Sequence, residues 1–132
     1  MAAGRFSFTI EQGATLDLEL AYKDSSSLAV DLTDHQARMQ LRPSIGSDTV
    51  ILTLSSSLEP DGTGLNLSGS AGLNPLTSGT IGIFISANSS SQLSFTDAVY
   101  DLEISSGSVF PVVTRILEGN VQLSKNVTLG SF

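Results

Sequence analysis

The segment TLDLELAY, residues 15–22, places apolar side chains at every second position. Successive side chains of a β-strand point to opposite faces, so the leucines and Tyr22 share one face. Asp17 and Glu19 point the other way. This pattern predicts a half-buried strand, and the same period of two recurs along most of the chain.

Further strands are expected wherever this alternation returns. Their apolar positions are Ala37, Met39 and Leu41; Val50, Leu52 and Leu54; Leu65 and Leu67; Ile81, Ile83 and Ile85; Ala98, Tyr100, Leu102 and Ile104; and Leu117, Gly119, Val121 and Leu123. The last strand should run over about residues 112–123. Because Val112 and Ile116 fall on its opposite face, either a β-bulge or a strand start that is buried on both faces is expected there. A surface loop is expected over residues 69–79, and Asn88 is expected to cap a single helical turn.

About seven to eight short strands with close turns predict an all-β fold. The expected architecture is an immunoglobulin-like antiparallel two-sheet sandwich, with a small barrel or jelly roll as the alternative. A chain of 132 residues corresponds to one domain, residues 1–132. Within it, residues 1–12 are expected to form an extended N-terminal arm and residues 124–132 a flexible C-terminal tail.

The composition excludes several classes of protein. With 40% hydrophobic and 14% charged residues, the chain is too apolar to stay unfolded. Its net charge of -7 repels phosphate backbones and anionic lipid headgroups, so neither nucleic acid nor a membrane is an expected partner. There is no cysteine and no apolar run of the roughly 20 residues that span a bilayer. We expect no export signal, because the first five residues lead directly into an alternating segment.

Residues 62–96 contain no Asp, Glu, Lys or Arg. Surfaces that are buried against partner chains are depleted of charge, because a desolvated charge has to be paired. A solvated sheet face rich in Ser and Thr gives the same composition. Both interpretations stay open from the sequence.

The candidates for catalysis and metal binding are weak. The single histidine, His35, is not accompanied by a serine in a nucleophile-elbow pattern. The acid pairs, for example Asp17 with Glu19, lie two apart on strands, where they share an outward face rather than a cleft. The DGTG segment at residues 61–64 lacks the later ligands of a calcium loop. We therefore expect no enzymatic activity, no catalytic residue, no cofactor and no metal.

The arginines are expected on outward faces. Arg38 and Arg42 lie opposite to the apolar positions of their strand. Arg115 follows a hairpin whose other strand exposes Asp101 and Glu103, so cross-strand ion pairing is its simplest use.

Five segments, in order, resemble a known family. They are MAAGRFSFTIEQGAT (residues 1–15), VDLT leading into ARMQLR (residues 30–33 and 37–42), the strand over residues 79–87, YDLEI (residues 100–104) and VTRILEG (residues 113–119). They look like small virion proteins of tailed bacteriophages. They resemble the immunoglobulin-like domain at the N-terminus of phage baseplate upper proteins, which also occurs as short stand-alone chains, including in cyanophages.

The resemblance implies a place in the virion. It implies a tail, baseplate or neck component that docks other virion proteins, including fibre subunits, in multiple copies within a symmetric assembly. The matched segments carry residues that are expected to support the fold: Gly13, Tyr100, Asp101, Arg115, Glu118 and Gly119. The two glycines suit close backbone approach, and Tyr100 can bury its ring while its hydroxyl reaches the backbone.

The function expected from this reasoning is that of a non-enzymatic adaptor that binds its neighbours through sheet edges and an uncharged surface. Five aromatic side chains are the expected partner contacts: Phe6, Phe8, Phe84, Phe95 and Phe132. A capsid decoration protein is the alternative within the same class. A carbohydrate-binding module is the alternative from another class, although the chain has no Trp and only two Tyr to stack on sugars.

Overall fold

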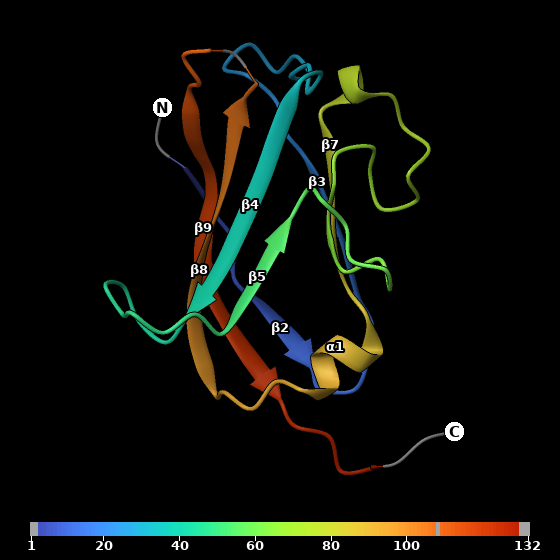
Figure 1. Cartoon of the computed structure of the whole chain (residues 1–132), viewed down its shortest axis with the longest axis vertical. Coiled ribbons are helices and arrows are strands. Elements are labelled where there is room, and N and C mark those ends of the chain that lie inside the picture. Colours follow the sequence, from blue (N-terminus) through green and yellow to red (C-terminus); the bar gives the residue numbers. More distant parts are fainter. Residues whose placement is uncertain (1–2, 108, 130–132) are drawn as a thin grey trace.

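The computed structural model describes residues 3–107 and 109–129, and it shows an all-β protein (Figure 1). In chain order, the elements of these residues are β1 (Gly4–Arg5), β2 (Phe8–Glu11), β3 (Leu16–Ala21), β4 (His35–Arg42), β5 (Leu52–Ser55), β6 (Gly64–Asn66), the 3-10 turn η1 (Leu76–Ser78), β7 (Thr80–Ile85), α1 (Ala87–Ser91), β8 (Asp97–Ser106) and β9 (Val113–Ser124).

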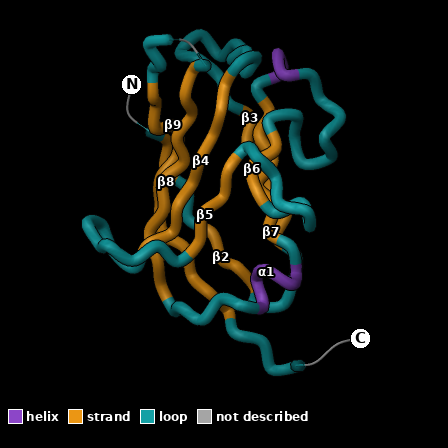
Figure 2. The backbone as a smooth tube through the Cα atoms, viewed as in Figure 1, coloured by secondary structure: helices purple, strands orange, loops and turns teal. Residues whose placement is uncertain are grey.

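The strands form two sheets that pack face to face (Figure 2). The large sheet has the order β1-β9-β8-β4-β5, with β2 also on β9, and the small sheet has the order β3-β7-β6. In immunoglobulin domains one sheet has the strand order A-B-E-D and the other contains C, F and G. Here β3, β7 and β6 follow the order B-E-D, while β4, β8 and β9 follow the order C-F-G. The structure confirms an immunoglobulin-like sandwich.

The core lies between the two sheets, where the alternation predicted it. The expected inward positions of β4, β7 and β8 are all buried: Ala37, Met39, Leu41, Ile81, Ile83, Ile85, Ala98, Tyr100, Leu102 and Ile104. The leucines of β3 are half-buried and pack against the same core.

Three details of the strands differ from the sequence prediction. Val50 lies outside β5 and is exposed, because the chain enters that strand only at Leu52. Tyr22 and Leu67 follow the ends of β3 and β6, although both pack against the core. The last strand, β9, runs from Val113 to Ser124, so it begins and ends one residue later than predicted.

The predicted bulge is present in β9. Leu102 pairs with Leu117, but the next residue of β8, Glu103, pairs with Arg115. Ile116 is therefore the extra residue. Because the bulge shifts the alternation by one position, Ile116 and Leu117 are both buried.

The helical turn begins earlier than the sequence indicated. Asn88 was expected to cap it, but the N-cap is Ser86, whose side chain accepts a hydrogen bond from the Ser89 backbone N–H. Ser90 follows within α1 and is fully buried. Its hydroxyl donates to the Ala14 carbonyl at 2.7 Å, which ties α1 to the start of β3. Serine is as good an N-cap as asparagine, so the sequence alone left this choice open.

The N-terminal arm belongs to the large sheet. β1 and β2 pair with β9 in parallel, from Gly4 beside Leu117 to Glu11 beside Ser124. The Phe6 N–H bridges the two short strands by donating to the Glu118 carbonyl at 2.9 Å. The sandwich is thus antiparallel except along this edge, where residues 4–5 and 8–11 of the predicted arm provide two parallel strands.

Gly119 and Tyr100 hold this arm in place. The arm passes so close to β9 that a Cβ at Gly119 would collide with the Phe6 carbonyl oxygen. The Tyr100 hydroxyl donates to that same oxygen at 2.5 Å. The Tyr100 ring meets Phe8 edge-on with ring centroids 5.2 Å apart, which adds to the burial of the arm.

Gly119→Ala should therefore weaken the protein by displacing the arm. We expect a loss of about 1–3 kcal/mol in the free energy of unfolding, as is common when a close-packed site receives an extra methyl group. Gly4→Ala is the control on the same edge, because its Cβ would meet its neighbours at an ordinary 3.6 Å. Urea unfolding of both variants measures the difference, and equal stability of the two would contradict this account of the arm.

The Tyr100 hydroxyl should also make stability fall at alkaline pH. Burial raises the pKa of Tyr100 to about 12. The unfolded chain releases this proton near pH 10, so stability that is present below pH 10 is lost as the pH rises toward 12. Thermal unfolding between pH 9 and 12 should show a smaller alkaline loss in Tyr100→Phe than in wild type. Tyr22→Phe, which keeps the Tyr100 hydroxyl, should behave like wild type in this range.

Candidate functional site

The most distinctive surface of the fold is the outer edge of β3. β3 pairs with β7 from Leu16 beside Ile85 to Ala21 beside Thr80, and within residues 3–107 and 109–129 no strand pairs with its other side. In the A-B-E-D arrangement this is the place of strand A. Because the first strands of this chain pair with β9 instead, the small sheet is left with an open edge.

The open edge offers unpaired backbone groups at alternate residues. The Tyr22 N–H donates to the Gly79 carbonyl at 2.8 Å, which fixes the phase of the β3–β7 ladder. Residues of an antiparallel pair alternate between facing their partner and facing away from it. Leu16, Leu18 and Leu20 therefore direct their N–H and C=O groups toward β7. Those of Asp17, Glu19 and Ala21 point outward, ready to pair with an added strand.

The side chains of β3 make this edge selective. Its leucines are half-buried on the core side, so an added strand would find apolar surface there. Asp17 and Glu19 are exposed on the opposite side. Charged side chains on edge strands discourage indiscriminate pairing. The edge therefore suits a partner strand that is apolar on one face and carries no carboxylate on the other.

An uncharged loop borders this edge. Residues 67–79 fold back over the outer face of the small sheet, so closely that a Cβ at Gly82 would lie 2.7 Å from the Ser70 backbone nitrogen. The Ser70 N–H and hydroxyl both donate to Glu19 Oε2 at 3.0 Å, which holds the loop beside β3. Residues 71–77 are exposed. The charge-free stretch thus supplies β6, β7 and α1 to the fold and, in residues 71–77, a neutral exposed rim that follows Ser70.

The other edges of the two sheets are formed by shorter strands, and at the β1–β2 edge of the large sheet these have two and four residues. β5, at the far edge of the large sheet, has four residues, and β6 has three. The chain beyond β6 continues into the 67–79 loop, which lies over the same sheet (Figure 1). Of the edges formed by the described residues, β3 presents the longest straight backbone at the margin of the small sheet.

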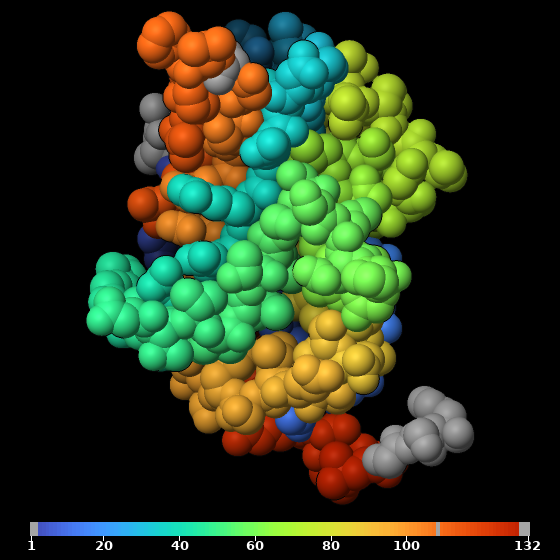
Figure 3. Space-filling view, viewed as in Figure 1, coloured from blue at the N-terminus to red at the C-terminus, as the bar shows by residue number. Residues whose placement is uncertain are grey.

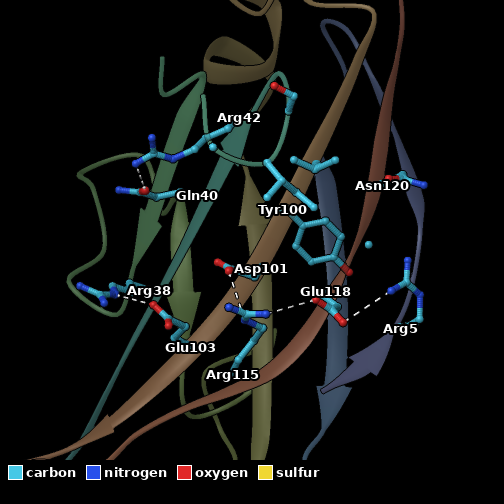
Figure 4. Close-up of a pocket in the computed structure, with 15 residues that line it drawn as sticks. Arg5, Arg38, Gln40, Arg42, Tyr100, Asp101, Glu103, Arg115, Glu118 and Asn120 are labelled. Atoms are coloured by element: carbon cyan, nitrogen blue, oxygen red, sulfur yellow. Dashed lines mark hydrogen bonds and ion pairs between the residues drawn. The ribbon is translucent and has the colours of Figure 1, made fainter. Parts of the chain in front are cut away.

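A second surface is the outer face of the large sheet, where all four arginines of the chain gather. Arg5, Arg38, Arg42 and Arg115 line a hollow of about 580 Å³ together with Gln40 and Asn120 (Figure 4). Ion pairs cross the strands here. Arg115 Nε lies 3.3 Å from Asp101 Oδ2, and Arg38 Nε lies 2.9 Å from Glu103 Oε1. The expected cross-strand pairing of Arg115 is confirmed.

Arg42 differs from the other three arginines. Its guanidinium donates to the Gln40 side-chain oxygen at 2.9 Å and to the Ser47 carbonyl oxygen at 2.5 Å, both neutral acceptors. The hollow is lined by four arginines and three carboxylates, Asp101, Glu103 and Glu118. The ten carboxylates and two lysines outside the hollow account for the negative net charge of the sequence. The sequence indicated the outward direction of Arg38 and Arg42, but the gathering of all four arginines depends on strand order.

The aromatic residues proposed as partner contacts lie in different environments. Phe6 is half-exposed on the arm and stacks on Phe8, with ring centroids 6.0 Å apart. Phe8 and Phe95 pack against the core. Phe84 is partly buried and covers Gly62. Phe132 lies outside the described residues. Of the four of these phenylalanines that the structure describes, Phe6 and Phe8 stack on each other.

The residues proposed to support the fold lie mostly around β9. Tyr100 and Gly119 hold the arm, as described above. Arg115 pairs with Asp101 and also lies 3.5 Å from Glu118, which in turn reaches Arg5 on β1 at the same distance. Gly13 takes a left-handed φ of +83° at the turn between β2 and β3, and its N–H donates to the Ser90 hydroxyl at 3.1 Å.

Two of the weak chemical candidates take part in local structure. His35 Nδ1 lies 2.9 Å from the Thr33 carbonyl oxygen at the start of β4. Within residues 3–107 and 109–129, no group of three or more His, Asp or Glu side chains gathers as metal ligands would. The DGTG segment forms the turn before β6, where the Gly62 N–H donates to the Glu59 carbonyl at 2.8 Å.

Asp61, in this turn, is a structural anchor that the sequence did not reveal. Its carboxylate accepts hydrogen bonds from the Ser86 hydroxyl at 2.5 Å, from the Ser89 hydroxyl at 3.0 Å and from the Thr63 N–H at 3.0 Å. These bonds, that of Ser86 first, hold the pKa of Asp61 well below its ordinary value. The carboxylate thereby fastens α1 to the β5–β6 connection.

Asp61 should make the protein sensitive to acid. A carboxyl group whose pKa is lowered in the folded state contributes stability at every pH above its ordinary pKa of about 3.8. This contribution is lost as the pH falls below that value. Asp61→Asn should unfold at a lower temperature than wild type at pH 7, with the difference shrinking between pH 4 and 2. Asp48→Asn, in the β4–β5 loop, is the control that keeps these bonds. Scanning calorimetry measures the unfolding temperatures across this range. If Asp61→Asn still unfolded as far below wild type at pH 2 as at pH 7, the role of Asp61 would be contradicted.

Comparison with known proteins leaves the site to be interpreted from its own geometry. No protein-family model and no curated protein sequence matches this chain. In the part of the chain that the structure describes, no helix is long and apolar enough to cross a membrane.

Proposed function

We propose that this chain is a non-enzymatic structural subunit that binds a neighbouring protein by accepting an extended segment along β3. The observation that carries the proposal is the open edge of the small sheet, at the place where an immunoglobulin-like sandwich has its strand A. Strand addition at such an edge derives its affinity from main-chain hydrogen bonds and its specificity from alternate side chains.

The chemistry of the edge supports this role. Asp17, Glu19 and Ala21 direct backbone groups outward, while the half-buried leucines between them leave apolar surface for the inward side chains of the partner. The neutral rim of residues 71–77 follows Ser70, which binds Glu19 of β3. A partner segment that reaches this rim would meet no charged side chain on it, and so would lose no ion hydration there.

For the setting, we propose the virion of a tailed bacteriophage, in a tail, baseplate or neck position. This part of the proposal is supported by the resemblance of five sequence segments to small phage virion proteins. In such a particle the chain would join tail, baseplate, fibre or neck subunits through its edges and its uncharged surface. Each docked strand would extend the small sheet of one subunit into the next.

Blocking the β3 edge should remove the chain from the assembled particle. The double variant Asp17→Pro/Ala21→Pro removes two outward N–H groups that an added strand would need. These groups take no part in the β3–β7 ladder, so the variant should stay folded. Asp17→Thr/Ala21→Thr is the matched control, because it changes the same side chains and keeps both amides. Circular dichroism verifies that both variants fold.

The measurement is the amount of each variant in purified particles, by quantitative immunoblot. We expect the proline variant to be reduced at least tenfold relative to the threonine variant. Equal incorporation of the two would overturn the role of the edge, and absence of the wild-type chain from particles would overturn the virion setting. Reconstruction of the particle would then distinguish a tail position from a capsid position, the alternative.

A further inference from the structure

The segment that follows β9 has the sequence pattern of a strand but forms none in the described chain. Residues 125–129, KNVTL, leave the end of the sandwich as an arm (Figure 1, Figure 3). Val127 and Leu129 alternate with Asn126 and Thr128, the pattern of a half-buried strand. Yet Val127 is 95% exposed and Leu129 is 78% exposed. Their apolar face has no cover within residues 3–107 and 109–129.

The root of this arm is fixed beside the start of β3. The Asn126 N–H donates to the Gln12 side-chain oxygen at 3.2 Å. A Cβ at Gly13 would lie 2.8 Å from the Asn126 side-chain nitrogen. Gly13 forms the turn that leads into β3. The arm and the open edge therefore begin at the same end of the molecule. Two copies that meet at this end can each place the arm next to β3 of the other.

The chemistry of the arm is complementary to that of the edge. Along β3, apolar side chains of an added strand would extend the half-buried row of Leu16, Leu18 and Leu20. Its opposite face would meet Asp17 and Glu19. Thr128 carries no charge, and its hydroxyl can donate a hydrogen bond to one of these carboxylates. The one charge of the arm, Lys125, is positive, so the acidic edge attracts the arm.

We infer that two copies of this chain exchange their C-terminal arms, each laying residues 127–129 along β3 of the other. A two-fold axis close to Gly13 and Asn126 would bring both roots together, so neither arm would have to cross a gap. The contact is isologous and closes into a dimer. The inference rests on the proposed function, because it names the occupant of the same edge as the arm of a second copy.

Sedimentation equilibrium of the full chain tests the dimer. Wild type is expected to form a dimer whose population rises with concentration between about 1 and 500 μM, the range in which strand exchange without a large interface is measurable. Val127→Asp/Leu129→Asp should weaken the dimer at least tenfold, because both substitutions place a carboxylate against the core row of β3. Ile45→Asp/Val109→Asp is the control, since those side chains are equally exposed on other loops. It should dimerise like wild type.

A spin label locates the contact. The chain has no cysteine, so Thr128→Cys gives one labelling position on the polar face of the arm. Spin-labelled protein at natural isotope abundance, mixed with ¹⁵N-labelled wild type, should broaden the amide signals of Asp17, Glu19 and Ala21. Signals of β4 should keep their intensity.

Three results would overturn the inference. The first is a wild type that is monomeric up to 500 μM, the second a Val127→Asp/Leu129→Asp variant that dimerises like wild type, and the third a label that broadens signals away from β3. If one of these occurs while the Asp17→Pro/Ala21→Pro variant is still lost from particles, the edge binds a different protein and the proposed function stands. The opposite outcome is also distinguishable. If the Asp17→Pro/Ala21→Pro and Asp17→Thr/Ala21→Thr variants enter particles equally, while the spin label on the arm still broadens the amide signals of β3, the proposed function fails and arm exchange stands.

Discussion

The pairing of residues 4–11 with β9 determines the surface on which the rest of this account depends. A chain that enters an immunoglobulin-like sandwich can cover the β3 edge of the small sheet or the β9 edge of the large one. Here the absence of a side chain at Gly119 lets the arm approach β9, and the Tyr100 hydroxyl binds the Phe6 carbonyl oxygen. Because the arm pairs with β9, no described strand pairs with the outward backbone groups of Asp17, Glu19 and Ala21.

An open edge has to coexist with solubility. Unpaired strand edges promote aggregation, and proteins commonly protect them with charged side chains. Asp17 and Glu19 provide that protection on β3, while Glu19 also holds the neutral 67–79 loop beside the edge. The same acids select a partner whose facing side chains are neutral or positive. One arrangement of side chains thus disfavours pairing with acidic strands and leaves room for a strand such as the C-terminal arm.

Much of the fold could be predicted from the sequence because alternation is a local property. The inward positions of β4, β7 and β8 follow from side-chain period alone. The break in the alternation before Leu117 indicated a bulge or a strand start buried on both faces, and the structure has the bulge. Properties that depend on which strands are neighbours could not be predicted in this way. The parallel pairing of the arm, the open edge of β3 and the gathering of four arginines on one face all depend on strand order. Local capping was ambiguous for another reason, since Ser86 and Asn88 are comparable N-caps.

Amide hydrogen exchange of the isolated monomer, followed residue by residue by NMR, tests the central claim most directly. If the outer edge of β3 is open, the N–H groups of Leu18, Leu20 and Tyr22, which bond to the strand beside them, should exchange slowly. Those of Asp17, Glu19 and Ala21 should exchange at rates close to those of an unstructured peptide. Uniform protection from residue 17 to residue 22 in a dilute monomer would show that the edge is already covered, and would contradict the account.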